Sequence, residues 1–440
     1  MQPTRDQRSV RVLFGSHPTV GHTAPLRTIA AELRDRGHRA GFVLPRMNLP
    51  FLRFLAAPIR AAAELPATIE RDGFDLLDAR PSLATLWHAS RLPSKTGYQE
   101  LRTAVDLFTS GAVEHAKLFA AHIQEWNADV VVGDYLLPSA MLAAMLTERP
   151  FAAVYHTALP FTVGGAPPFG SGLTERDRGS VAWRDAEREL SRVQAHFDER
   201  VAAAARALGI AHAPQGWLRR PISQALNLLA TTPELEPTLP ALNEPVVMTG
   251  PLFVAPKYSP ADDEFLAALP EDGADVYVSL GTVFNDRPEV YLAIMDAVEA
   301  AGLSAVVSAG NSYVAIAHRA SARMRVFARV PQVALLKRVR CVVTHGGNNT
   351  VQECLSAAKP MVVIPFGTDQ IENARRVERL GVGVGVMPGA LAADSLVRAV
   401  QWARFSESAH ERVQRIAQSL ATSGGVKRAA DAVLALVDDE

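Results

Sequence analysis

The densest group of residues able to do chemistry lies at positions 344–353, which read THGGNNTVQE. This run follows an apolar, strand-like segment and opens a helical pattern. Its glycines let the backbone approach a ligand closely, and the free N–H groups at a helix start bind anions. His345 adds a donor, and Asn349 or Thr350 can cap the helix. The alternative is a simple helix cap with Glu353 as its capping-box acid. A cap alone does not need a histidine, two glycines and two asparagines together, so the pattern favours a phosphate site.

Two other strand-like runs end in polar residues. Asp369 and Gln370 follow one of them, where an acid beside an amide can exchange hydrogen bonds with sugar hydroxyls. Asp369 could equally serve as the N-cap of a helix that begins near Ile371. Gly281 and Thr282 end the run VYVSLGT and offer a hydroxyl and backbone N–H groups to a diphosphate, a pattern that is weak by itself.

In the N-terminal half, His22 and Asp134 each follow a strand-like run. Because the carboxyl ends of parallel strands meet at one edge of a sheet, a pair between them is geometrically reasonable. The acid would orient the imidazole and stabilise its protonated form. Taken singly, His22 could be an ordinary helix-start histidine and Asp134 a turn residue.

Short apolar runs that predict buried strands alternate with helical patterns along the chain. The strand-like runs are at 10–14, 40–44, 129–132, 151–155, 276–279, 304–308, 341–344 and 361–364. Such alternation predicts the α/β class with doubly wound parallel sheets. Six prolines between positions 232 and 256 mark the best domain boundary. We therefore expect two doubly wound domains with a cleft between them.

Composition narrows the function classes. The 440 residues are 48% hydrophobic and 21% charged, with a net charge of −1. This balance excludes wholesale disorder and gives no sign of a nucleic-acid-binding protein. Cys341 and Cys354 cannot form a disulfide framework and are expected to be small buried hydrophobes. The sequence shows neither a signal peptide nor a membrane span, which favours a cytoplasmic protein.

At this point the residues resemble a known family. The stretch PTVGHTAP at 18–25, with Arg-Gly-His at 36–38, is similar to the opening motif of the family-one glycosyltransferases, the UDP-glycosyltransferase superfamily of GT-B fold. Residues 330–370 are similar to its donor-binding signature. The resemblance covers essentially the whole chain and favours the bacterial natural-product members.

The resemblance implies two Rossmann-like domains that face each other across a cleft. Residues 1–240 would bind the acceptor, 241–256 would link the domains, and 257–405 would bind the nucleotide sugar. The helical segment 406–440 could return to the N-terminal domain.

Roles follow from the same resemblance, position by position. His22 would be the catalytic base and Asp134 its acid partner, while Asp369 and Gln370 would hold the donor sugar. The diphosphate would be bound by Gly281, Thr282, His345, Gly347, Asn349 and Thr350. The nucleoside would be bound by Arg329, Val330, Gln332 and Glu353, with Glu353 on the ribose hydroxyls.

Three departures from the family pattern affect the choice of nucleotide. Arg329 stands where a tryptophan often stacks on uracil, and a guanidinium can also stack on a base. Asn348 replaces the tryptophan of the plant motif, as in bacterial members. Thr344-His345 lacks the doubled histidine frequent in enzymes that use dTDP-deoxysugars. With the Asp369-Gln370 pair intact, the resemblance favours a UDP-hexose over a dTDP-sugar.

The implied reaction is an inverting transfer to a small, apolar natural product, without a metal or other cofactor. The loop at 160–172 and the aromatic residues Phe51, Phe54, Trp87, Phe108 and Phe161 could line the acceptor site, or each could be ordinary core. No feature of the sequence determines the oligomeric state.

Other functions fit less well. A catalytically inactive GT-B protein that binds or activates a partner would be expected to lack His22, Asp134 or the phosphate loop. An epimerase is disfavoured by the opening motif. A nicotinamide dehydrogenase is disfavoured because no G-x-G-x-x-G follows the first strand-like run.

Overall fold

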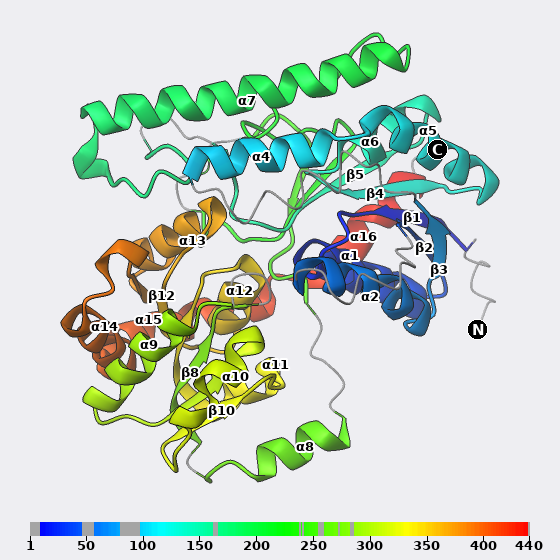
Figure 1. Ribbon diagram of the computed structural model, residues 1–440. Helices are drawn as coiled ribbons and strands as arrows, with labels where there is room; N and C mark the ends of the chain where they lie inside the picture. Colours follow the sequence, from blue (N-terminus) through cyan, green and yellow to red (C-terminus); the bar gives the residue numbers. More distant parts are fainter. Residues whose placement is uncertain are drawn as a thin grey trace.

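The chain folds into two α/β lobes, seen in a computed structural model (Figure 1). The structure describes residues 9–45, 57–79, 97–161, 166–236, 239, 242–253, 259–271, 273–281 and 286–438. Each lobe is built on one parallel sheet covered by helices. Among the helices described, none has the length and apolar character needed to cross a bilayer.

The N-terminal sheet has seven parallel strands in the order β3-β2-β1-β4-β5-β6-β7. Its central strands are apolar throughout because helices cover both faces of a parallel sheet. The strands are β1 (Arg11–Gly15), β2 (Arg39–Leu44), β3 (Asp75–Asp78), β4 (Val130–Asp134), β5 (Phe151–Tyr155), β6 (Leu226–Leu229) and β7 (Val246–Met248).

Helices of this lobe cover the sheet and extend over its top edge (Figure 1). They are α1 (Val20–Asp35), α2 (Ala57–Arg71), α4 (Gly97–Thr109), α5 (Ala112–Glu125), α6 (Pro138–Leu146) and α7 (Val181–Ala207), with a short 3-10 turn at Glu175–Asp177. The long α7 begins at Ser180, whose side chain accepts from the Trp183 N–H. It buries an apolar stripe that includes Leu190 and Phe197.

The C-terminal sheet has six parallel strands in the order β10-β9-β8-β11-β12-β13. They are β8 (Ala274–Ser279), β9 (Ala305–Ser308), β10 (Met324–Phe327), β11 (Val339–Thr344), β12 (Met361–Val363) and β13 (Gly383–Gly385). The helices are α8 (Pro260–Ala267), α9 (Pro288–Ala300), α10 (Tyr313–Ile316), α11 (Gln332–Leu335), α12 (Asn348–Ser356), α13 (Thr368–Arg379), α14 (Ala393–Phe405), α15 (Glu407–Thr422) and α16 (Gly425–Asp438). Short 3-10 turns lie at Gly310–Ser312, Ala317–Arg319, Leu336–Arg338 and Pro388–Ala390.

The predicted α/β class with two doubly wound parallel sheets is confirmed. One boundary differs from expectation, because β7 lies inside the segment 241–256 that its prolines marked as a linker. Pro245 precedes β7, and its carbonyl accepts the Asn227 N–H at 2.8 Å. A proline at the start of an edge strand costs no ladder hydrogen bond. The N-terminal sheet therefore continues up to Met248.

The last helix, α16, packs on the N-terminal lobe beside α1 (Figure 1). Its apolar face joins the core around β1, through Val426, Ala429, Ala430 and Val433. An ion pair between Arg36 and Asp431 closes one edge of this contact. The preceding helix α15 packs on α12 of the C-terminal lobe, so the chain crosses between the lobes a second time near residue 424.

Candidate active site

Two parallel strand ends bring His22 and Asp134 together. β1 pairs with β4, and Gly15 lies opposite Gly133 at their carboxyl ends. Asp134 is the last residue of β4, and His22 lies in the first turn of α1, which follows β1. The His22 Nδ1 is 2.5 Å from the Asp134 Oδ2. The Asp134 side chain is fully buried, whereas 22% of the His22 side chain is exposed.

Two further histidines lie in this cluster, and the sequence analysis missed both. His156 directly follows β5, and its Nε2 lies 3.2 Å from the Asp134 Oδ1. His17 is the second residue after β1, and its Nε2 lies 3.0 Å from the Leu136 carbonyl. Both are buried. Their positions after buried strands were the available signal, the same one that identified His22 and Asp134.

The charges of the cluster depend on one another. Burial alone would raise the pKa of Asp134, but His22 and His156 hold that pKa well below its usual range. Burial also works against a charged His22, yet Asp134 raises the pKa of His22 above 6.5. Burial lowers the pKa of His17 to about 4. His17 is therefore neutral near pH 7, and Asp134 is a carboxylate that supports a proton on His22.

His22, Asp134 and His156 also form a group of possible metal ligands, with their ligand atoms within 4.8 Å of one another. Ligands about 2.0–2.2 Å from a tetrahedral zinc would lie about 3.3 Å apart. The 2.5 Å between His22 Nδ1 and Asp134 Oδ2 is shorter than that spacing and is typical of a charge-assisted hydrogen bond. The geometry observed fits proton sharing better than metal coordination.

On the C-terminal side, glycines make room for His345. A Cβ on Gly281 would lie 2.5 Å from the His345 ring, and one on Gly347 would lie 2.7 Å from it. Gly281 has a φ of +75°, which also favours glycine. Burial lowers the pKa of His345 to about 4, so the ring is neutral near pH 7. Thr282 lies outside the described residues.

Helix α12 begins without a side-chain cap. Its N-cap is Gly347. The sequence had suggested Asn349 or Thr350 as the capping residue, and neither caps the helix. Asn349 instead donates to the Gly21 carbonyl across the lobes at 3.3 Å. Glu353 is bonded to Gln332 rather than to the helix start. No side chain therefore caps the first N–H groups of α12, an arrangement able to bind an anion.

Gln332 connects the residues expected around the nucleoside. Its Oε1 accepts from the Tyr277 hydroxyl at 2.8 Å, and its Nε2 donates to the Glu353 Oε2 at 2.5 Å. Burial raises the pKa of Glu353. The preceding residues Arg329, which is exposed, and Val330, which is half-buried, lead into α11. The structure thus brings Gln332 and Glu353 together and leaves Arg329 on the surface beside them.

Asp369 and Gln370 have different roles at the start of α13. The Gln370 Oε1 accepts from the backbone N–H groups of Phe366 at 2.8 Å and Gly367 at 3.2 Å. The Gln370 side chain therefore accepts from the backbone just before α13. The N-cap residue is Gly367, and not Asp369 as in the alternative. Burial raises the pKa of Asp369, and the nearby His22 opposes that rise. The Asp369 carboxyl is thus near enough to His22 and His156 of the other lobe for their charges to interact.

Several hydrogen bonds hold the lobes together at this site. The Asn348 Nδ2 donates to the His156 carbonyl at 2.7 Å, and the Gln352 Nε2 donates to the Ala230 carbonyl at 2.5 Å. Arg376 of α13 forms a buried ion pair with Glu236. The contacts keep the start of α12 close to the strand ends of the N-terminal sheet.

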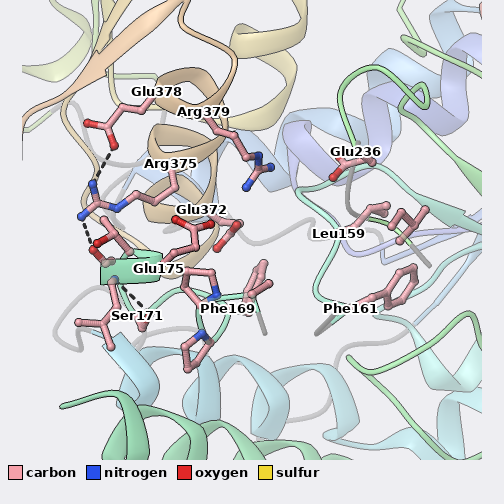
Figure 2. A pocket seen from close by; sticks show the side chains of 17 residues that line it. Leu159, Phe161, Phe169, Ser171, Glu175, Glu236, Glu372, Arg375, Glu378 and Arg379 are labelled. Carbon is pink, nitrogen blue, oxygen red and sulfur yellow. Dashed lines mark hydrogen bonds and ion pairs between the residues drawn. The ribbon is translucent and has the colours of Figure 1, made fainter. Parts of the chain in front are cut away.

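A cavity of about 240 Å³ opens where the loop after β5 meets α13. Figure 2 shows Leu159 and Phe161 on one side, with Glu372 and other charged side chains of α13 toward the other. Phe161 is thus a wall residue. Phe108 packs instead against the His17 ring, with the centroids 4.4 Å apart, and lies beside His22. Phe51, Phe54 and Trp87 lie outside the described residues.

Comparison with known proteins shows which proteins this chain resembles. Residues 237–419 match the family described as UDP-glucoronosyl and UDP-glucosyl transferase. Along almost its full length, the chain is 27% identical to 4'-demethylrebeccamycin synthase from Lentzea aerocolonigenes, covering 97% of this chain and 99% of that protein. The chain is thus similar to glycosyltransferases over both of its lobes, and the family match lies in its C-terminal part.

Other similar proteins align with only part of the chain. A UDP-glucosyltransferase named YojK from Bacillus subtilis is 28% identical over 214 residues, which is 48% of this chain and 52% of that protein. The chain thus spans about half the length of the first curated relatives it matches. The crystal structure of the glycosyltransferase of kitacinnamycin has a TM-score of 0.72 and 22% identity, covering 98% of this chain and all of that one. This likeness shows the shared GT-B fold.

Proposed function

We propose that this protein is an inverting, metal-independent glycosyltransferase with His22 as its base. It transfers a hexose from a nucleoside diphosphate, UDP in preference to dTDP, to a small, apolar natural product. The observation that carries the proposal is the 2.5 Å contact between His22 and buried Asp134, with His22 close enough to Asp369 of the other lobe for their charges to interact. A base, its orienting acid and a sugar-side acid meet at one interdomain site.

In this mechanism, His22 Nε2 removes the proton from an acceptor hydroxyl, because Nδ1 is engaged by Asp134. The acceptor oxygen attacks the anomeric carbon as the bond to the diphosphate oxygen breaks, and that oxygen keeps the electron pair. A positioned base contributes about 10²–10⁴-fold to such a step. The proton on His22 is stabilised by the Asp134 carboxylate, as the raised pKa of His22 requires.

The leaving diphosphate would be held by neutral donors and backbone rather than by a cation. The uncapped N-terminus of α12 offers free N–H groups and the positive end of a helix dipole. His345, Asn349 and Thr350 add side-chain donors, and Gly281 and Gly347 let the phosphates approach. Donors preorganised in a buried site stabilise developing negative charge strongly.

The other proposed contacts to the nucleotide sugar also come from the C-terminal lobe. Glu353 would accept from the ribose hydroxyls in exchange for its bond to Gln332, while Arg329 and Val330 would flank the base. Asp369 would hold sugar hydroxyls, with Gln370 shaping the loop beneath them and offering its amide N–H. An acid and an amide at this position support a hexose that keeps its hydroxyl groups.

The acceptor would occupy the cavity beside α13, with Leu159, Phe161 and Phe169 as its apolar wall. The loop residues at 166–172 would then lie beside the acceptor. The similarity to a synthase of the rebeccamycin type supports an apolar natural product as the acceptor class.

The experiment that tests this proposal is a calorimetric titration with UDP, dTDP and NAD in metal-free buffer. It compares the wild type with Glu353→Ala, and with Glu264→Ala as a control at an exposed acid on α8. UDP should bind more tightly than dTDP, NAD should not bind, and only Glu353→Ala should weaken UDP binding. Absence of binding by either nucleotide would overturn the proposal in favour of an inactive GT-B protein that acts on a partner.

A further inference from the structure

The Asp134 carboxylate is shared between two histidines rather than paired with one. Its Oδ2 contacts the His22 Nδ1 at 2.5 Å. Its Oδ1 accepts the Leu136 N–H at 2.9 Å and lies 3.2 Å from the His156 Nε2. The 3.2 Å contact with the His156 Nε2 is at the long end of the range for a hydrogen bond, and His156 helps His22 to hold the pKa of Asp134 low.

His156 is held in this position from both sides. Only 3% of its side chain is exposed, and its ring lies edge-on to His22 with the centroids 4.7 Å apart. Its backbone carbonyl accepts the Asn348 amide at 2.7 Å. Because that bond uses the backbone, it links the start of α12 to position 156 whatever side chain stands there.

The other groups around His22 do not replace this contact. Asp369 on α13 adds negative charge toward His22, and neutral His17 adds none near pH 7. Phe108 on α4 is apolar, and Asn349 on α12 is neutral and bonded to Gly21. Among the described side chains around His22, His156 is therefore the one whose ring nitrogen contacts the Asp134 carboxylate, at 3.2 Å.

We propose that His156 is a positioning residue that shares Asp134 with His22 and so weakens the hold of His22 on its proton. This inference rests on the proposed function, in which His22 must be unprotonated to accept a proton from the acceptor. A buried carboxylate with His22 as its single partner would keep that histidine protonated to higher pH. Sharing the carboxylate leaves more of the base available near neutrality.

The experiment is NMR titration of the imidazole groups in histidine-labelled protein, with His22→Asn for assignment. His156→Met fills the site without a polar hydrogen, and His156→Gln keeps an N–H donor there. In His156→Met, the pKa of His22 should rise by about one, with a smaller rise in His156→Gln. An unchanged His22 in folded His156→Met overturns the proposal, as does an equal rise in both variants.

Two further NMR measurements complete the test. The His196–Asp106 pair, in contact at 2.7 Å, serves as an internal reference, and its resonances should be the same in all variants. If neither variant at 156 folds, the ¹⁵N spectrum of the wild type decides, because the His156 Nε2 must carry a hydrogen. A bare Nε2 overturns the proposal.

The titration needs neither donor nor acceptor, so its outcome is independent of the proposed reaction. If His22 responds as expected but neither nucleotide binds in calorimetry, the shared carboxylate stands and the transferase proposal fails. If the protein transfers sugar but His22 does not respond, only the role of His156 fails.

Discussion

The two lobes supply opposite kinds of chemistry to one site. In the N-terminal lobe, charge is concentrated on buried side chains around Asp134, and that carboxylate sets the behaviour of His22. In the C-terminal lobe, His345 is neutral, and the start of α12 offers backbone N–H groups that no side chain caps. Handling a proton requires a group whose charge can change, whereas holding a diphosphate requires donors whose charge does not change. In the proposed function, the site therefore separates proton transfer from anion binding by lobe.

The largest expected effect comes from removing the proton-handling pair. His22→Ala or Asp134→Asn should lower turnover by about 10²–10⁴-fold, because the base or its orienting acid is lost. Binding of UDP-glucose, measured by calorimetry, should stay nearly unchanged. Asp106→Asn, which disrupts the other His–Asp contact, is the control and should keep its turnover. Unchanged turnover in His22→Ala would remove His22 as the base.

The next effect concerns the ion pair that joins the lobes. Arg376 and Glu236 are almost fully buried, with 3% and 11% of their side chains exposed. Arg376→Met should lower the free energy of unfolding by about 3–5 kcal/mol, because Glu236 is left buried and unpaired. Denaturant unfolding measures this loss. Adding Glu236→Leu should recover much of it, and a double variant as unstable as the single one would contradict this account.

A smaller effect is expected where glycine admits His345. Gly281→Ala places a methyl group 2.5 Å from the His345 ring in a backbone conformation that disfavours alanine. UDP affinity should fall about tenfold, which is about 1.4 kcal/mol. Gly389→Ala, where a Cβ would meet nothing within 4 Å, is the matched control. Equal UDP affinity in Gly281→Ala and Gly389→Ala would show that His345 does not take part in binding the diphosphate.

The pH dependence should divide between the lobes. The base acts unprotonated, and the pKa of His22 lies above 6.5, so kcat/KM should rise with pH through a midpoint above pH 6.5. The pKa of His345 is about 4, so this ring does not change its charge between pH 5.5 and 8. The charge of His345 should therefore add no pH dependence to the binding of UDP-glucose over that range. If the affinity for UDP-glucose changed with pH in the same way as kcat/KM, proton transfer and donor binding would not be divided between the lobes.

The smallest expected effect is that of a chelator. Because the α12 N-terminus and its neighbouring donors are proposed to hold the diphosphate, EDTA should leave the transfer rate unchanged. Rates are compared before and after dialysis against EDTA. Complete loss of activity, restored by Mg²⁺ or Mn²⁺, would show that the C-terminal lobe needs a cation.

The difference between the lobes also governs what could be predicted from the sequence. The loop at 344–353 is continuous, so its residue types identified an anion site, and both sheets followed from apolar alternation. The N-terminal cluster is assembled from the ends of β1, β4 and β5, and β1 lies more than 100 residues from the other two in sequence. Only two members of the cluster were found. His156 was missed because one histidine after a strand has no local pattern. Residue spacing also could not show that the Gln370 side chain accepts hydrogen bonds from the backbone N–H groups of Phe366 and Gly367 at the start of α13.

Short edge elements were missed for a related reason. β7 is three residues long and lies among prolines, which locally favour a linker, and its pairing with β6 decides its state. Tertiary contacts override local preference in such segments. The family match shows the same difference between the lobes. It spans residues 237–419, which contain the loop at 344–353 but neither His22 nor Asp134.

The return of α16 to the N-terminal lobe has a consequence for recombination between relatives. A chimera made with a single crossover near residue 250 would combine one parent's N-terminal core with the other parent's last helix. Val426, Ala429 and Val433 would then meet a foreign surface in place of β1 and α1. Exchange of donor specificity should therefore use two crossovers, one after β7 and one near residue 424. The transplanted module would be a chain-internal insert, not a C-terminal half.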